Sequence, residues 1–173
     1  DFLKNFGFAD ETTVVAPGSN GKMNELQAAY GLLQLKYVEE NTEKCRKIAE
    51  IYRDRLRDVP GIRVLEGIPG VKHNYCYFPI FVDENEYGMS RDEFYLRLRE
   101  QGIHGRRYFY PLVSELPTYR GHASAWAGHL KIARRLTEQI ICIPLYHDLP
   151  TTLAHSIAEA IQKCTAHSEE VGR

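Results

Sequence analysis

Asn20 and Lys22 are polar residues that stand just ahead of a predicted helix start and are not needed to make it. Asn24 and Gln27 have the spacing of a capping box, in which each side chain accepts a hydrogen bond from the other residue's backbone N–H. Capping therefore explains only Asn24 and Gln27. Because the unpaired N–H groups and the dipole of a helix start favour an anion, Asn20 and Lys22 are candidate anion contacts. The alternatives are that Asn20 is only the turn residue of an Asn-Gly pair and that Lys22 is a solvated lysine.

A second group of chemistry-bearing residues is concentrated in the stretch RRYFY. A guanidinium can pair with phosphate oxygens, and a phenolic hydroxyl can hydrogen-bond a sugar. An alternating strand with one polar and one aromatic face would produce the same pattern without any ligand, so both interpretations stay open. The candidate residues are Arg106, Arg107, Tyr108 and Tyr110.

Other catalytic and metal-binding patterns are poorly supported. The cysteines are Cys45, Cys76, Cys142 and Cys164. They are far apart, with no C-x-x-C pair, so we expect buried free thiols in a reducing cytoplasm, and a disulfide framework is the alternative. His122 and His129 lack a third ligand at useful spacing, and no metal site is predicted. The sequence contains neither the arrangement of a Ser-His-Asp or Cys-His nucleophile nor a phosphate-loop motif.

The composition indicates one core of ordinary size and no strong net charge. The 173 residues are 43% hydrophobic and 26% charged, with 22 basic and 23 acidic side chains. This balance does not attract nucleic acid or an anionic membrane. The longest apolar runs, such as IICIPLY, are too short to cross a bilayer, and the first residues lack the layout of a signal peptide. We therefore predict a cytoplasmic protein without nucleic-acid or membrane partners.

Apolar spacing predicts the elements that position these residues. Leu26, Tyr30 and Leu33 follow helical spacing, and the pattern resumes after a slip near Asn41. This predicts a long connecting helix over 24–59 that is kinked near Asn41. Alternating apolar runs and helix starts then predict strands at 62–66, 75–82, 106–110 and 140–143 in one sheet, with helices from Ser90, about Ser124 and about Thr151.

These elements indicate an α/β fold. Strands and helices that follow a long helix are typical of a small sheet of three or four strands covered by helices. We divide the chain into a short first region at 1–23, the connecting helix at 24–59 and a small α/β domain at 60–173.

Four motifs occur in an order that resembles one protein family. They are LKNFGF, GSNGKMNELQAAYGLLQL, GRRYFYPLVSELPTY and CIPLYHDLP. Together they are similar to the C-terminal half of the DegT/DnrJ/EryC1/StrS family of sugar aminotransferases, and the second motif is the most specific. The resemblance implies the small domain of a fold-type I pyridoxal-phosphate aminotransferase, preceded by a long connecting helix. The region 1–23 is then expected to be a remnant of the large cofactor domain with its phosphate-contact loop.

The resemblance also implies roles for the candidate residues. In this family the motif that contains Asn20 reaches the phosphate of the neighbouring subunit's pyridoxal phosphate, so the full-length enzyme is expected to be a homodimer. Lys22 would take a nearby anion-binding role toward the substrate. The four candidates of RRYFY would bind a keto-6-deoxyhexose linked to a nucleoside diphosphate, and glutamate is the usual amino donor. Val113 stands where the family often has histidine, so no imidazole role is assigned there.

One expected residue of the family is missing from the sequence. The family's cofactor-binding lysine precedes a glycine-rich turn ahead of LKNFG, and neither is found here. Lys4 and Lys22 belong to other motifs, so no catalytic residue is assigned. We therefore expect a C-terminal fragment that is inactive by itself. The alternative is a non-catalytic dimerisation or sugar-nucleotide-binding module of the same fold.

Overall fold

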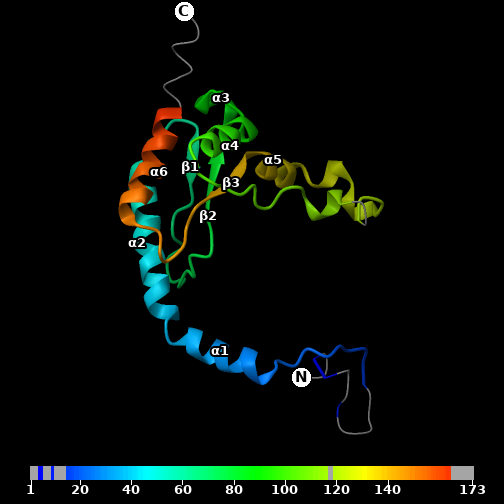
Figure 1. Ribbon diagram of the computed structural model, residues 1–173. Helices are drawn as coiled ribbons and strands as arrows, with labels where there is room; N and C mark the ends of the chain where they lie inside the picture. Colours follow the sequence, from blue (N-terminus) through cyan, green and yellow to red (C-terminus); the bar gives the residue numbers. More distant parts are fainter. Residues whose placement is uncertain (1–3, 6–8, 10–14, 117–118, 165–173) are drawn as a thin grey trace, which may run out of the picture. The chain divides into compact units, whose positions relative to one another are not determined.

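The computed structural model describes residues 4–5, 9, 15–116 and 119–164. The parts of the predicted first and last regions at 1–3, 6–8, 10–14 and 165–173 lie outside the described residues. The chain divides into two units, Asp1–Glu40 and Asn41–Arg173, and each is described by itself. Figure 1 shows the order of the elements along the chain.

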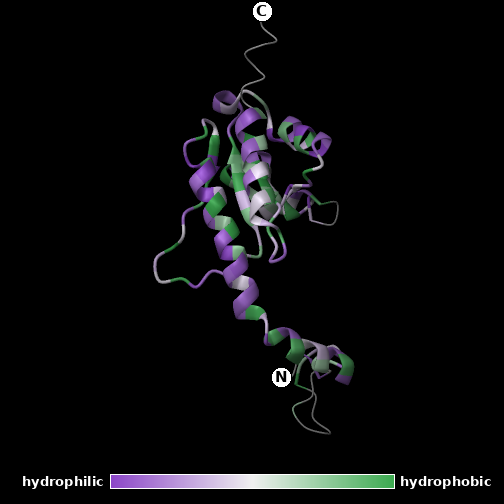
Figure 2. Cartoon of the chain, turned by 60° about the vertical axis from the view of Figure 1, so that its left-hand side comes forward, coloured by the Kyte–Doolittle hydropathy of each residue, from purple (hydrophilic) through white to green (hydrophobic). Residues whose placement is uncertain are grey.

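The first unit contains helix α1, Glu25–Leu35. The predicted capping box forms its start: the Gln27 N–H donates to Asn24 Oδ1 at 2.9 Å, and the Asn24 N–H donates to Gln27 Oε1 at 3.3 Å. Ahead of the helix, Asn5 and Asn20 form an isolated antiparallel bridge. No residue of α1 is buried, although apolar side chains occur along its length (Figure 2).

Helix α2, Val38–Leu56, begins after a break at Lys36 and Tyr37. The helical pattern is thus interrupted a few residues before Asn41, near which the kink is predicted, and Asn41 itself lies inside α2. The break has a local cause. The N–H groups of Lys36 and Tyr37 donate to carbonyl oxygens three residues back, at 3.2 and 3.0 Å, which tightens the last turn and ends the α-helical pattern.

The second unit contains a three-stranded antiparallel sheet in the order β1–β2–β3. Its strands are β1 (Ile62–Val64), β2 (Phe78–Val82) and β3 (Ile140–Ile143). Ile62 pairs with Val82 and Ile80 pairs with Ile141. Because side chains alternate along a strand, these residues lie on one face of the sheet. That face carries the buried side chains of the core.

Helices α2, α4 (Arg91–Glu100) and α6 (Thr151–Cys164) share one hydrophobic core with the sheet. α2 and α6 run side by side (Figure 1). The Gln162 side chain of α6 donates to the Arg55 carbonyl oxygen of α2 at 2.6 Å. Tyr52 of α2 donates its hydroxyl to the Pro144 carbonyl oxygen at 2.9 Å. The helices are therefore fixed by specific polar contacts as well as by apolar packing.

The short helix α3, Glu84–Tyr87, packs against the turn that precedes β1. Gly61 in that turn has a φ of +74°, and a Cβ added to it would lie 2.3 Å from the Tyr87 nitrogen. Only glycine fits this close approach. The buried Tyr87 donates its hydroxyl to the Ile161 carbonyl oxygen at 2.7 Å, so the turn, α3 and α6 are held together.

Two predicted strands are shorter than expected. β1 ends at Val64 rather than at 66, and β2 begins at Phe78 rather than at 75. Tyr75 has a left-handed backbone with a φ of 50°, and its N–H donates to His73 Nδ1 at 2.8 Å. The chain therefore turns immediately before β2, because a residue in the left-handed region cannot continue a strand.

The predicted strand at 106–110 is wrong. Arg106 forms one isolated bridge with Cys142, and the chain then leaves the sheet. The N–H groups of Tyr108 and Tyr110 donate within the segment, to the carbonyl oxygens of residues 106 and 107, at 2.9 and 3.0 Å. These local bonds use the donors that a further ladder would need.

One predicted helix begins later than expected, and two others begin as predicted. The region near Ser124 forms short 3-10 turns instead of a helix, because bonds between residues three apart close them. The elements there are η2 (Ala123–Ala125), η3 (Ala127–His129) and α5 (Lys131–Gln139). Ser90 caps α4 by accepting the Glu93 N–H at 3.2 Å, and α6 begins at Thr151.

Candidate functional site

Asn20 and Lys22 lie exposed in the first unit, on the stretch that leads into α1. The backbone of this stretch is held by the bridge at Asn20 and by the Gly21 N–H, which donates to the Lys4 carbonyl oxygen at 2.9 Å. A Cβ on Gly21 would lie 3.1 Å from Lys4 Cβ, so the two segments approach closely. Backbone contacts therefore set the position of both candidate residues.

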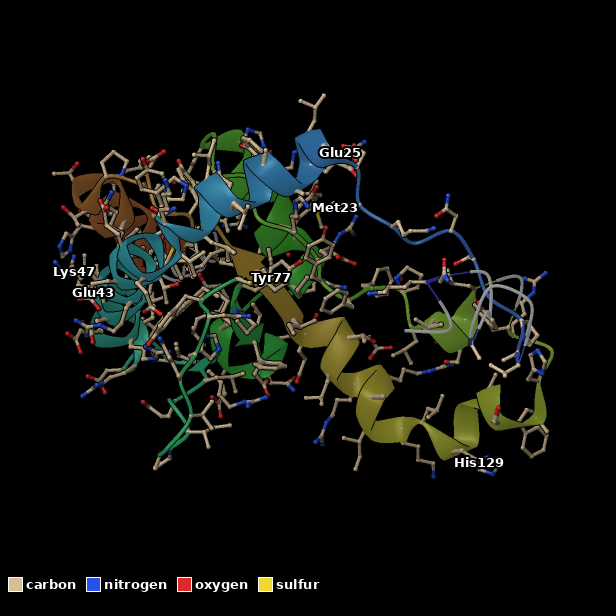
Figure 3. All side chains as sticks on the ribbon, turned by 90° about the horizontal axis from the view of Figure 1, so that it is seen from below. Met23, Glu25, Glu43, Lys47, Tyr77 and His129 are labelled. Atoms are coloured by element: carbon tan, nitrogen blue, oxygen red, sulfur yellow. The ribbon has the colours of Figure 1, made fainter. Side chains whose placement is uncertain are left out.

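The helix start beside these residues is already compensated. Asn24 accepts the Gln27 N–H, and Glu25 places a carboxylate in the first turn (Figure 3). Both features offset the positive end of the helix dipole, which weakens the dipole argument for an anion. The amide of Asn20 is a donor type that fits the phosphate end of pyridoxal phosphate, and the ammonium of Lys22 is a cation type that fits a nearby anion.

In the second unit, Arg106 lines a groove with a volume of about 320 Å³. Its Nη1 donates to Tyr108 Oη at 2.6 Å, so the guanidinium and the phenol form a pair. Tyr77, labelled in Figure 3, also lines the groove, and its ring meets the Tyr108 ring edge to face with centroids 5.4 Å apart. A cation and a phenol held together beside an open groove can bind a phosphate oxygen and a hydroxyl of the same ligand.

Of the four candidates only Arg106 lines this groove, and Arg107 and Tyr110 have different surroundings from the Arg106–Tyr108 pair. Arg107 Nη1 lies 3.0 Å from Asp92 Oδ1, and its guanidinium lies 4.7 Å from the Tyr95 ring centroid. Partial burial alone would raise the pKa of Asp92, but the hydrogen bond from Arg107 and the charges of Arg91 and Arg107 lower this pKa below its ordinary value. The structure thus separates the four RRYFY candidates into two pairs.

Sequence reasoning missed three residues that line the groove with Arg106. Tyr77, His104 and Tyr146 contribute aromatic side chains to it. Tyr77 was expected inside a strand, and Tyr146 belongs to the motif CIPLYHDLP. His104 precedes Arg106 by two residues, which is the one local signal that could have indicated it.

The cysteines are free thiols, but one of them is not buried as expected. Cys45, Cys142 and Cys164 are buried, whereas Cys76 is exposed and lines the groove. Burial raises the pKa of Cys142 to about 11. The buried thiol is therefore protonated at neutral pH and is not a reactive nucleophile.

Val113 lines a second, almost entirely apolar groove of about 330 Å³, beside residues of α5. It is the first residue of η1, Val113–Glu115, and it is 66% exposed. The neighbouring lining side chains include Phe109, Leu112 and Leu136. The position that often carries histidine in the resembled family is thus part of an apolar surface in this chain.

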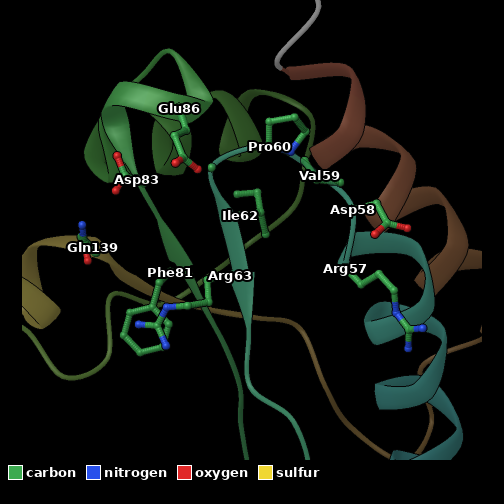
Figure 4. Close-up of a pocket in the computed structure, with 11 residues that line it drawn as sticks. Arg57, Asp58, Val59, Pro60, Ile62, Arg63, Phe81, Asp83, Glu86 and Gln139 are labelled. Atoms are coloured by element: carbon green, nitrogen blue, oxygen red, sulfur yellow. The ribbon is translucent and has the colours of Figure 1, made fainter.

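A third hollow, of about 410 Å³, lies beside the Pro60–Gly61 turn (Figure 4). Its lining mixes acidic and basic side chains, and the Arg63 guanidinium lies 3.9 Å from the Phe81 ring centroid. It contains none of the residues predicted to bind a ligand. Because its charges have both signs, it does not indicate one class of ligand.

No group of three or more potential metal-ligating side chains occurs among the residues that the structure describes. In the same part of the chain, no helix has the length and apolar character that a membrane crossing requires.

The profile of the DegT/DnrJ/EryC1/StrS aminotransferase family matches residues 1–162. The chain is 45% identical over 161 residues to the dTDP-4-amino-4,6-dideoxy-D-glucose transaminase of Escherichia coli, and this match covers 93% of the chain and 43% of that protein. It is 32% identical to the UDP-4-amino-4-deoxy-L-arabinose–oxoglutarate aminotransferase of Shewanella sediminis, over 91% of this chain and 42% of that protein. The chain thus spans less than half the length of these relatives.

A solved structure of DesI in the presence of its TDP-sugar product has a similar fold. The TM-score is 0.84 with 31% sequence identity, and the match covers 98% of this chain and 42% of that one. Helicobacter pylori PseC, an aminotransferase of pseudoaminic acid biosynthesis, matches with a TM-score of 0.80 at 22% identity, over 96% of this chain and 45% of that one, which shows a shared fold. The predicted α/β fold class of the small aminotransferase domain is confirmed.

Proposed function

Because the chain belongs to the DegT/DnrJ/EryC1/StrS aminotransferase family, we propose that it is the C-terminal part of an aminotransferase that acts on a nucleotide-linked keto-6-deoxyhexose. The names of the Escherichia coli relative and of the DesI structure support a sugar linked to thymidine diphosphate. The name of the Shewanella relative includes oxoglutarate, which supports glutamate as the amino donor. We further propose that the full-length enzyme is a homodimer.

One observation carries the substrate proposal: Arg106 donates to Tyr108 at 2.6 Å beside the groove. The guanidinium would pair with a diphosphate oxygen, and the phenol would bond the hexose. Tyr77, His104 and Tyr146 would supply aromatic walls on which a sugar or a base can lie. Arg107 is already paired with Asp92, so we assign it no direct contact with the ligand.

We assign Asn20 and Lys22 to the phosphate of pyridoxal phosphate and to a nearby anion, respectively. When bound, the cofactor supplies the electron sink for amine transfer. The Asn20 amide would donate to a phosphate oxygen, and Lys22 would add a positive charge. Both contacts orient and hold; neither residue is assigned a proton-transfer step.

The substrate assignment can be tested in the full-length enzyme with Arg106→Gln. The assay uses dTDP-4-amino-4,6-dideoxy-D-glucose, named for the Escherichia coli relative, with 2-oxoglutarate, and it measures glutamate. Loss of a charge-assisted contact is worth about 1.5–3 kcal/mol, so KM should rise by about ten- to a hundredfold. Arg135→Gln, an exposed arginine on α5, is the matched control. An equal KM in both variants would contradict the assignment, and binding without turnover in the parent would favour the non-catalytic module.

The cofactor assignment can be tested with Asn20→Ala in the same enzyme. One lost hydrogen bond to a charged group should weaken pyridoxal-phosphate retention by about 1.5–3 kcal/mol, measured by equilibrium titration. Folding should change little, because the backbone bridge at Asn20 does not use the side chain. Equal affinity in the variant and the parent would mean that Asn20 is only a turn residue.

A further inference from the structure

The first turns of α4 contact the RRYFY segment through side chains that no sequence motif indicates. Asp92 Oδ1 lies 3.0 Å from Arg107 Nη1. The Arg107 guanidinium also lies 4.7 Å from the Tyr95 ring centroid and 6.0 Å from that of Tyr110. Arg107 is thus surrounded by one carboxylate and two aromatic rings.

Arg91 contacts the same carboxylate oxygen, Asp92 Oδ1. Its side chain is buried, and Nη1 donates to the carbonyl oxygens of Thr137 and Ile140 at 3.0 and 2.8 Å, where α5 ends. A cation at a helix C-terminus is favourable, so Arg91 is rigidly held. Its buried Nε has no hydrogen-bond partner and lies 2.9 Å from Asp92 Oδ1, an ion-pair contact outside hydrogen-bond direction. Asp92 therefore lies between a buried arginine and Arg107.

The sheet holds the RRYFY segment at Arg106 alone, so the residues that follow depend on other contacts. The segment's one bridge to β3 is at Arg106, and the bonds that follow are internal to the segment. Arg106 and Arg107 are adjacent, and only Arg106 lines the groove. A contact that fixes the Arg107 side chain against α4 therefore limits rotation of the backbone between Arg106 and Arg107. This keeps the Arg106 side chain directed to the groove.

We propose that Asp92 is a positioning residue that, through Arg107, holds Arg106 and Tyr108 in the geometry that binds the nucleotide sugar. The identity of the ligand in this proposal rests on the proposed function, whereas the contacts of Asp92 do not. The Asp92–Arg107 pair is half exposed, with 56% and 39% of the side chains accessible, so it contributes little to global stability. A purely structural role would accordingly be small, whereas a positioning role would be seen in ligand binding.

The test compares Asp92→Asn with Glu93→Gln in the full-length enzyme. Glu93 is the matched control, because its ion pair with Arg97 at 2.9 Å lies on the same helix and does not contact the segment. With dTDP-4-amino-4,6-dideoxy-D-glucose as substrate, Asp92→Asn should raise KM about tenfold and leave kcat within about twofold. Combining Asp92→Asn with Arg107→Gln should raise KM little further, because both substitutions remove the same Asp92–Arg107 contact. Glu93→Gln should leave both constants unchanged.

A second measurement keeps this test independent of the proposed function. Amide hydrogen exchange should become faster at Tyr108 and Tyr110 in Asp92→Asn, and should not change in Glu93→Gln. If the parent enzyme does not turn over the sugar nucleotide, the proposed function fails, while the exchange rates still decide the role of Asp92. The positioning role would be overturned if Asp92→Asn kept the parent's exchange rates at both amides. It would also be overturned if the parent is active and Asp92→Asn has the same KM as the parent.

Discussion

Helices α1 and α6 both carry apolar side chains along their length, but the fold covers only one of them. α6 buries Ala154, Ile157, Ala158, Ile161 and Cys164 in the core. α1 buries no residue, and its Leu26 is 83% exposed. The comparison shows that helical apolar spacing predicts a helix correctly in both cases but does not predict what covers it.

The difference follows from what each helix finds to pack on. α6 lies against a sheet face whose branched side chains repeat every second residue. A run of exposed apolar side chains such as Leu26, Tyr30 and Leu33 marks a surface that binds another surface. We expect residues of the full-length protein outside this chain to cover α1, since the relatives are longer.

The largest expected effect is on activity. The 173-residue chain alone should transfer no amine if, as the resemblance implies, the family's cofactor-binding lysine belongs to a segment ahead of LKNFG. Glutamate formation from 2-oxoglutarate and an amino-sugar nucleotide is the measurement. Adding the remaining part of the enzyme in trans should restore it. Turnover by the isolated chain would refute the interpretation as an inactive fragment and the expectation that α1 must be covered by residues outside this chain.

The next effect is on stability. Ile161→Ala in α6 should lower the free energy of unfolding by about 2–5 kcal/mol, because it leaves a cavity in the core. Leu33→Ala in α1 should change it by less than about 0.5 kcal/mol in the isolated chain. Urea denaturation followed by circular dichroism measures both. In the full-length enzyme the Leu33 variant should become markedly more costly; similar values in the two proteins would show that α1 needs no cover.

A smaller effect separates the tyrosines of the two regions. Tyr87→Phe should cost about 1–3 kcal/mol, because the buried Ile161 carbonyl oxygen loses the hydroxyl at 2.7 Å. Tyr30→Phe, in exposed α1, is the control and should be neutral. Equal unfolding midpoints for the two variants would show that the Tyr87 hydrogen bond contributes no net stability.

The smallest effect concerns pH and the start of α4. The pKa of Asp92 is lower in the folded chain than in the unfolded chain, so its contribution is present above the unfolded value and is lost as the pH falls through the folded value. Since the side chain is 56% exposed, the contribution should stay below about 1 kcal/mol. Asp92→Asn should flatten that acid limb of the stability curve, and Arg107→Gln should reduce it. An unchanged limb in both variants would contradict the ion pair.

Local hydrogen-bonding patterns were predictable from the sequence. The capping box at Asn24 and the cap at Ser90 need only residues three positions apart, so their side chains find the predicted backbone donors. The strand at 106–110 was not predictable. Its alternation described side-chain character, but pairing depends on free backbone donors, and the N–H groups of Tyr108 and Tyr110 are used inside the segment.

The sequence by itself determined the family, the starts of α1, α4 and α6 and the residue types that could meet an anion, because all of these are written in contiguous motifs. Only the tertiary structure decided which of those residues line the groove beside Arg106. Asp92 comes from a different element and pairs with Arg107, whereas Arg106 turns to the groove with Tyr77. Neighbours in the chain thus have different surroundings, because side-chain direction depends on contacts with elements that lie far away in the sequence.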